Sequence, residues 1–251
     1  MRFVLYNIRY GTGVGRQIHL PWDRYLRRTS KNLARIVAFL KGLKPDIVGL
    51  VEVDAGSYRS GRANQAELIA SELGHYHCHE SKYSSVSLAR RLPLISKQVN
   101  AFLTREPISN RNFHYFRKGL KRLVIELELK EVIIFLVHLS LKFRTRHHQL
   151  SDLYSLVQAA RKPVIVAGDF NAFWGDSEIK LFLAATGLRS ASPHGAPSFP
   201  SWAPKRQLDF IFYSPDIKVT HFEIPAVTLS DHLPLVCDFH IVRQAKAASD
   251  R

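Results

Sequence analysis

The feature that most constrains this chain is a short apolar run that ends in polar residues, at positions 164–172 with the sequence VIVAGDFNA. A continuous apolar run of this length predicts a strand that is buried on both faces. The run stops at Gly168, and Asp169 and Asn171 follow it. A buried strand that delivers a carboxylate and a carboxamide to one sheet edge indicates a site, because such groups need a metal, a water or a phosphate as partner. An aspartate in a turn after a strand is equally common, so this segment needs support from others.

Several other apolar runs of the chain also end in, or begin beside, polar residues that can bind a metal or a phosphate. Together with those of the first segment, these residues are Asn7, Glu52, His138, Asp169, Asn171, Asp209, Asp231 and His232. Carboxylate and amide oxygens dominate the set, histidine joins them, and no thiolate does. Hard oxygen ligands suit Mg²⁺ or Mn²⁺ better than they suit structural zinc. The sequence therefore predicts a site for a hard divalent cation where these strand ends meet.

Runs typical of buried strands alternate with runs of helical spacing, which predicts an α/β protein. With 251 residues, 46% of them apolar, and no stretch that resembles a linker, we expect a single domain over residues 1–243 and a flexible polar tail at 244–251. Met1 leads directly into a strand pattern, and no apolar run is long enough to span a bilayer. Cys78 and Cys237 are too few for a disulfide framework. We therefore expect a soluble, cytoplasmic protein.

The chain is strongly basic, with a formal net charge of +15 and a pI of about 10.0. Charge of this size favours a polyanionic partner, which could be a nucleic acid, an anionic membrane surface or a phosphorylated small molecule. In the helix predicted from about Asp23 to Leu43, one basic stripe is formed by Arg24, Arg28, Lys31 and Arg35. Such a stripe is either a solvated face or a surface that attracts phosphate.

Three histidines alternate with other residues at positions 75, 77 and 79. If this segment is a strand, His75, His77 and His79 lie on one face of it. No carboxylate cluster accompanies them in the sequence. A solvent-exposed strand is therefore the favoured interpretation, and metal ligation is the alternative.

Six segments, in order along nearly the whole chain, carry a resemblance to a known family. They are residues 6–9 (YNIR), 45–53 (PDIVGLVEV), 137–140 (VHLS), 168–172 (GDFNA), 208–211 (LDFI) and 230–235 (SDHLPL). With these motifs the chain resembles the endonuclease/exonuclease/phosphatase superfamily, which includes deoxyribonuclease I, abasic-site endonucleases, neutral sphingomyelinases and inositol-polyphosphate 5-phosphatases. The resemblance implies two packed mixed β-sheets in a sandwich flanked by helices, a four-layer arrangement like that of deoxyribonuclease I.

The resemblance also implies a metal site. Glu52 would be the principal ligand of Mg²⁺ or Mn²⁺, Asn7 would lie beside it, and Asp231 would bind the metal or support its ligands. His138 stands where the deoxyribonuclease and sphingomyelinase branches carry a histidine. Residues 99–103 lack the glycine that often precedes the asparagine in this family, which leaves the role of Asn100 open.

The same resemblance assigns catalytic roles. His232 would take a proton from water as general base, and Asp209 would set its tautomer and raise its basicity. Asp169 would orient the attacking water, and Asn171 would donate to the phosphoryl oxygens. His138 would contact the phosphate or act as an acid toward the leaving group.

We therefore expect a monomeric, divalent-metal-dependent hydrolase of phosphodiester bonds, and a nuclease that acts on DNA or RNA is the favoured function. A phospholipid or sphingomyelin phosphodiesterase is an alternative, because the charge suits an anionic membrane equally well. Phe170, Phe173 and Trp174 could contact such a membrane or pack inside the protein. A small-molecule phosphatase is another alternative. A non-catalytic nucleic-acid-binding module on the same fold is the last, and the complete set of site residues argues against it.

Overall fold

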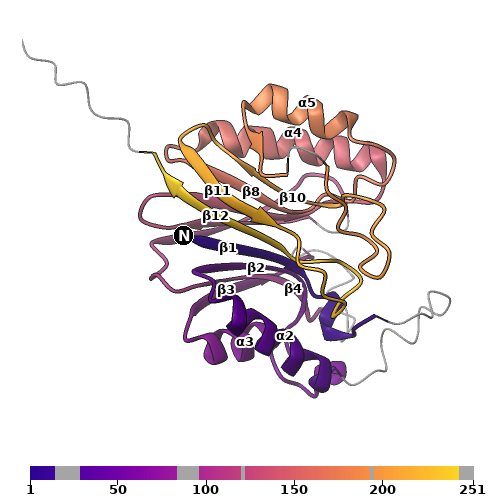
Figure 1. Cartoon of the computed structure of the whole chain (residues 1–251). Coiled ribbons are helices and arrows are strands. Elements are labelled where there is room, and N and C mark those ends of the chain that lie inside the picture. Colours follow the sequence, from indigo (N-terminus) through magenta and orange to yellow (C-terminus); the bar gives the residue numbers. More distant parts are fainter. Residues whose placement is uncertain (15–28, 84–95, 120–121, 193–194, 243–251) are drawn as a thin grey trace, which may run out of the picture.

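The computed structural model describes residues 1–14, 29–83, 96–119, 122–192 and 195–242. Within these residues two six-stranded mixed sheets pack face to face, and two helices cover the outer face of each sheet (Figure 1). The strand order is β11-β12-β1-β2-β4-β3 in the first sheet and β5-β6-β7-β8-β10-β9 in the second. This architecture confirms the predicted α/β sandwich. None of the described helices is long and apolar enough to cross a membrane.

The elements have the following bounds. The first sheet contains β1 (Arg2–Asn7), β2 (Ile47–Asp54), β3 (Tyr76–Ser81), β4 (Gln98–Thr104), β11 (Ile217–Glu223) and β12 (Leu235–Ile241). The second sheet contains β5 (Asn110–Tyr115), β6 (Leu123–Glu128), β7 (Ile133–His138), β8 (Val164–Asp169), β9 (Arg189–Ser190) and β10 (Asp209–Tyr213). The helices are α2 (Ser30–Leu43), α3 (Gln65–Leu73), α4 (Phe143–Ala159) and α5 (Ser177–Thr186), and the short 3₁₀ turns are η1 (Arg9–Gly11) and η2 (Tyr58–Ser60).

The layers explain why the central strands are apolar throughout. In β1, Phe3 and Leu5 point into the core between the two sheets, whereas Val4 and Tyr6 point into a second core beneath α2 and α3. A third core lies between the second sheet and the helices α4 and α5. Because both faces of each sheet are covered, residues of either parity along a central strand are buried. The continuous apolar runs in the sequence are a consequence of this arrangement.

The structure contains one strand that was not predicted and describes only part of one predicted helix. Strand β5 was not predicted from the sequence, because its polar sequence NRNFHY forms an edge strand whose residues are only half-buried or exposed. In the predicted helix 23–43, the described part is α2, which begins at Ser30. Lys31 and Arg35 of the basic stripe are exposed there. Arg24, Arg28 and the predicted tail at 244–251 lie outside the described residues.

The pairing of the central strands brings their polar ends together. Strands β1 and β2 are parallel, as are β7 and β8, so each pair ends at a common edge. His138 at the end of β7 lies in register with Asp169 at the end of β8. Strand β10 runs antiparallel to β8, so its first residue, Asp209, also pairs with Asp169. Residues from distant parts of the sequence therefore meet at one edge of the sandwich.

Gly168 permits this close approach of β7 and β8. A Cβ atom at Gly168 would overlap the carbonyl oxygen of Val137 on the neighbouring strand. We expect Gly168→Ala to lower the free energy of unfolding by about 1–3 kcal/mol, because the backbone of β7 must move to make room. Gly42→Ala, on α2 and with no atom near the added methyl group, should be neutral or stabilising by up to about 1 kcal/mol. Urea unfolding of both variants tests this, and a Gly168→Ala protein as stable as the parent would contradict it.

Candidate active site

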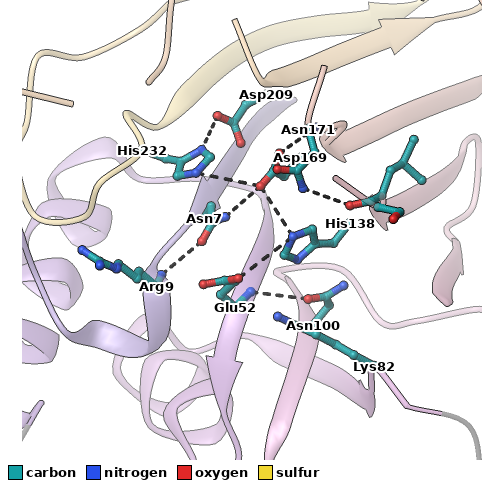
Figure 2. Close-up of polar contacts among 12 residues, drawn as sticks. Asn7, Arg9, Glu52, Lys82, Asn100, His138, Asp169, Asn171, Asp209 and His232 are labelled. Atoms are coloured by element: carbon teal, nitrogen blue, oxygen red, sulfur yellow. Dashed lines mark hydrogen bonds and ion pairs between the residues drawn. The ribbon is translucent and has the colours of Figure 1, made fainter. Parts of the chain in front are cut away.

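The polar residues predicted from the strand ends converge at the edge where β1, β2, β7, β8 and β10 meet (Figure 2). Seven of them are buried there: Asn7, Glu52, His138, Asp169, Asn171, Asp209 and His232. Their side chains form a connected set of contacts between the two sheets. Asp231 borders this set and is half-buried. The arrangement groups residues that are more than two hundred positions apart in the sequence.

The carboxylate of Asp169 is the centre of the cluster. Its Oδ2 atom accepts a hydrogen bond from Asn7 Nδ2 at 3.1 Å. The same oxygen lies 3.6 Å from His138 Nε2 and 3.8 Å from His232 Nε2. Its Oδ1 atom accepts the backbone N–H of Asn171 at 3.0 Å. A backbone N–H thus holds one carboxylate oxygen of Asp169, and the other oxygen faces two imidazoles.

His232 is held by Asp209. The Nδ1–H group of His232 donates to Asp209 Oδ2 at 2.7 Å, and the hydroxyl of Ser198 donates to the same oxygen at 2.6 Å. This bond places the second ring nitrogen, Nε2, toward Asp169. An imidazole with its Nδ1–H on a carboxylate and its Nε2 facing the site has the tautomer that a general base requires.

The charges around His232 determine its protonation. Burial lowers the pKa of His232. The carboxylates of Asp209, Asp169 and Asp231 raise it by more than burial lowers it, and the resulting pKa is about 10. The carboxylates around His232 therefore favour the protonated imidazole. A cation held by these carboxylates would oppose their effect and would lower the pKa of His232 toward the range of a general base.

Glu52 reaches the site through an irregularity in β2. The register between β2 and β4 shifts between Leu50 and Val53, and Glu52 adopts a left-handed backbone conformation with φ of 57°. The Oδ1 atom of Asn100 accepts the backbone N–H of Glu52 at 3.4 Å, which gives Asn100 a supporting position. The carboxylate of Glu52 then lies 4.0 Å from His138 Nε2. Such bulges re-aim side chains, and a non-glycine residue in this conformation costs about 1–3 kcal/mol, so both are common at functional sites.

The donor set fits a hard divalent cation. The carboxylates of Glu52 and Asp169 are buried on either side of His138, and Asn7 adds an amide oxygen that also accepts the N–H of Arg9 at 3.1 Å. Buried carboxylates at this density require compensating positive charge. Glu52, Asn7 and Asp169 are the residues that would hold the ion. These are the oxygen ligands that Mg²⁺ and Mn²⁺ prefer.

Two acidic residues near these strand ends have other partners. Asp231 forms an ion pair with Arg9 Nε at 3.2 Å and accepts the Ser230 hydroxyl at 3.2 Å. Its role at the metal stays a prediction. Asp54, two residues after Glu52, is fully buried and paired with Arg59 at 2.8 Å. The irregularity at Glu52 separates a carboxylate of the site from one that stabilises the neighbouring turn.

Several residues at the site were not assigned roles by the sequence analysis. Arg9 belongs to the YNIR motif, which was the available signal, and it joins Asn7 to Asp231. Ser198 lies in a proline-rich loop that carried no signal. Lys82 is almost completely buried and donates to the hydroxyl of Tyr10 at 3.2 Å, and nothing in its surrounding sequence marked it.

Comparison with known proteins gives matches over most of the chain. The sequence profile of the Endonuclease/Exonuclease/phosphatase family matches residues 4–232. A UPF0294 protein from Erwinia tasmaniensis is 30% identical over 160 residues, which are 61% of this chain and 52% of that protein. The chain thus spans about half the length of this curated relative.

Solved structures share the fold over almost the whole chain. The catalytic domain of human Nocturnin with a bound sulfate anion has a TM-score of 0.69 at 23% identity, and the match covers 96% of this chain and 94% of that one. The mannosyl-6-phosphatase of Bacteroides thetaiotaomicron has a TM-score of 0.71 at 15% identity, with 96% of this chain and 100% of that one covered. At these identities the likeness concerns the fold.

Proposed function

Because this chain belongs to the endonuclease/exonuclease/phosphatase family, we propose that it is a divalent-metal-dependent hydrolase of phosphodiester bonds with a nucleic acid as its substrate. Membership alone suggests a metal-dependent phosphoesterase. The observation that carries the proposal is the buried pair of Asp209 and His232, with His232 Nε2 facing Asp169. A binding module without catalysis would have no need for a buried, oriented imidazole among carboxylates, whose burial is costly.

Each side chain has a step that its position allows. The bound cation would neutralise charge on the phosphate and stabilise the oxygen that departs. His232 Nε2 takes the proton of the attacking water, while Asp209 keeps the Nδ1–H in place. Asp169 accepts the second hydrogen of that water and orients it.

The phosphoryl group is held from the opposite side. Asn171 donates one of its two amide N–H groups to the carbonyl oxygen of Leu139 at 2.9 Å, so its second N–H is the donor for a phosphoryl oxygen. His138, between Glu52 and Asp169, contacts the phosphate or protonates the leaving oxygen. His138 ends β7, and Asn171 lies two residues after the end of the adjacent strand β8.

Charge around the site supports a nucleic acid. The chain carries a formal net charge of +15, and Lys142 and Arg144 are exposed on the segment that follows His138 and begins α4. Arg146, two residues further on, is fully buried in an ion pair with Glu178 at 2.5 Å and takes no part in such contacts. The exposed Lys142 and Arg144 are therefore the candidate phosphate contacts.

Binding to DNA should depend steeply on salt. In EDTA, which prevents cleavage, we expect the logarithm of the binding constant for duplex DNA to fall with the logarithm of salt concentration by about 0.9 per phosphate neutralised. The double variant Lys142→Ala/Arg144→Ala should weaken binding and reduce the slope by about 1 for each lysine or arginine removed. Arg105→Ala is the matched control, because Arg105 pairs with Asp46 at the opposite end of β2. A salt-independent binding constant would contradict a nucleic-acid substrate.

A lipid phosphodiesterase is the second candidate, and one observation favours it. Leu141 and Phe143, which follow β7, are more than half exposed, and Trp174, which follows β8, is 83% exposed. Large apolar side chains beside basic ones suit an anionic membrane. Phe170, by contrast, belongs to the core. Hydrolysis of DNA, RNA, sphingomyelin, cardiolipin, bis-p-nitrophenyl phosphate and a sugar phosphate, each with Mg²⁺ and Mn²⁺, separates the candidates. Turnover of sphingomyelin or cardiolipin vesicles without turnover of DNA or RNA would overturn the nuclease proposal.

A further inference from the structure

Two of the three alternating histidines meet a carboxylate that their own segment lacks. His77 and His79 lie on β3, and Glu67 lies on α3, which covers the outer face of the first sheet (Figure 1). Ligand atoms of Glu67, His77 and His79 all lie within 4.8 Å of one another. The solvent-exposed strand favoured by the sequence is corrected in this respect: both histidines are half-buried beside the helix.

The strand geometry places both imidazoles on the helix side. Cys78, between them, points into the core between the two sheets, so His77 and His79 point to the opposite face. Their rings are nearly parallel, with centroids 5.8 Å apart and planes inclined by 5°. His75 precedes the strand and takes no part, because its two ring nitrogens contact the carbonyl oxygens of Leu73 and Pro45 at 2.9 and 3.0 Å.

The side-chain amide of Asn64 contacts two of the ligand atoms, one from Glu67 and one from His79. Asn64 Oδ1 accepts the N–H of Ala66 as the N-terminal cap of α3, which fixes the orientation of the amide. Its Nδ2 group therefore is the donor, 2.8 Å from Glu67 Oε1 and 3.3 Å from His79 Nε2. Because an amide NH₂ group only donates, His79 Nε2 presents its lone pair to the same place as the carboxylate.

We propose that Glu67, His77 and His79 form a transition-metal site, of the class that takes Zn²⁺, separate from the active site. Two imidazoles and one carboxylate are a common ligand set for zinc, with a water as the fourth ligand. Imidazole nitrogen selects such ions over Mg²⁺, whereas the oxygen ligands at Glu52 and Asp169 select the hard cation. The cation would replace the amide of Asn64 between Glu67 and His79.

The position of the site indicates what a bound ion does. Strand β3 is an edge strand of the first sheet, and β4 beside it carries Asn100, which supports the backbone of Glu52. An ion shared by α3 and β3 ties this edge strand to the helix layer. We therefore expect Zn²⁺ to raise the melting temperature without replacing Mg²⁺ or Mn²⁺ in catalysis.

Zinc binding in a protein with a weakened active site tests the proposal. The Glu52→Gln variant is stripped with chelator and dialysed against Zn²⁺ in excess Mg²⁺, and bound zinc is counted by mass spectrometry. We expect about one Zn²⁺ per chain. His77→Gln, His79→Gln and Glu67→Gln, each added to Glu52→Gln, should weaken that binding at least about tenfold. His75→Gln and Glu72→Gln are the matched controls and should leave it unchanged, since neither side chain faces the cluster.

Co²⁺ provides a second readout that does not depend on activity. The visible absorption of bound Co²⁺ should appear in the Glu52→Gln protein and disappear when His77 or His79 is also replaced. Glu67 is exposed, so Glu67→Gln keeps the test open if a histidine variant fails to fold. Absence of bound zinc in the Glu52→Gln protein would overturn the proposal. Zinc binding that survives all three ligand substitutions would do the same.

Discussion

Replacing His232 with alanine is expected to lower kcat by about 10²–10⁴-fold, the range that general acid–base assistance supplies. His232 Nε2 faces Asp169, and the buried carboxylate of Asp209 accepts its Nδ1–H at 2.7 Å. Asp209→Asn should be nearly as damaging, because an amide in place of the carboxylate that accepts the Nδ1–H weakens the preference for the required tautomer. Steady-state kinetics on bis-p-nitrophenyl phosphate measure both losses.

The double variant of His232 and Asp209 separates a cooperating pair from two independent residues. Because Asp209 acts through His232, His232→Ala/Asp209→Asn should be little worse than either single variant. His221→Ala, at an exposed histidine on β11, is the control and should keep full activity. If the losses are additive, or if His232→Ala keeps more than roughly a tenth of the parent rate, another group is the base. His138 is then the first residue to replace.

Removing the divalent cation is expected to abolish hydrolysis. EDTA should reduce the rate to background, and added Mg²⁺ or Mn²⁺ should restore it, because the buried carboxylates at the site need a cation to accept an anionic phosphate. Glu52→Gln should shift the metal concentration for half-maximal rate by more than the roughly 10–100-fold typical of residues that only support a ligand. Glutamine keeps the size of the side chain, so the loss reports on its charge.

One control variant and one thermal measurement separate loss of the metal ligand from a general loss of charge or of folding. Glu106→Gln removes an exposed carboxylate at the far end of β4 and should leave the metal dependence unchanged. Thermal unfolding in EDTA should show that the Glu52→Gln protein is folded. Full hydrolysis in excess chelator would contradict a metal-dependent mechanism for this site.

Much of the fold and of the candidate site could be predicted from the sequence, because the burial of each strand determines its own local pattern of apolar residues. A strand covered on both faces must be apolar at every position, so β1, β2, β7 and β8 appear as continuous runs, and a polar residue at the end of such a run is conspicuous. Asn7, Glu52, His138 and Asp169 were expected together because each ends such a run, and the parallel pairing of β1 with β2 and of β7 with β8 brings them to one edge. The six motifs then implied the sandwich that the structure has.

Other features depend on contacts that no local pattern carries. Strand β5 is half-exposed and polar, so it lacks the periodicity by which a buried strand is recognised. A bulge, rather than residue type, sends Glu52 into the site and leaves Asp54 with Arg59. Arg146 lies in a basic segment, yet Glu178 of α5 buries it.

The sequence by itself determined which residue types lie at the strand ends. A strand that is buried on both faces is apolar at every position, so its polar end residues can be identified along the chain. Only the tertiary structure decided which charged groups face one another. Ser198 supports Asp209, Arg9 neutralises Asp231, and Glu67 of α3 completes the pair of histidines on β3. The physical reason is that charges interact through space over a few ångströms, and the folded chain brings together groups whose separation in sequence carries no trace of that distance.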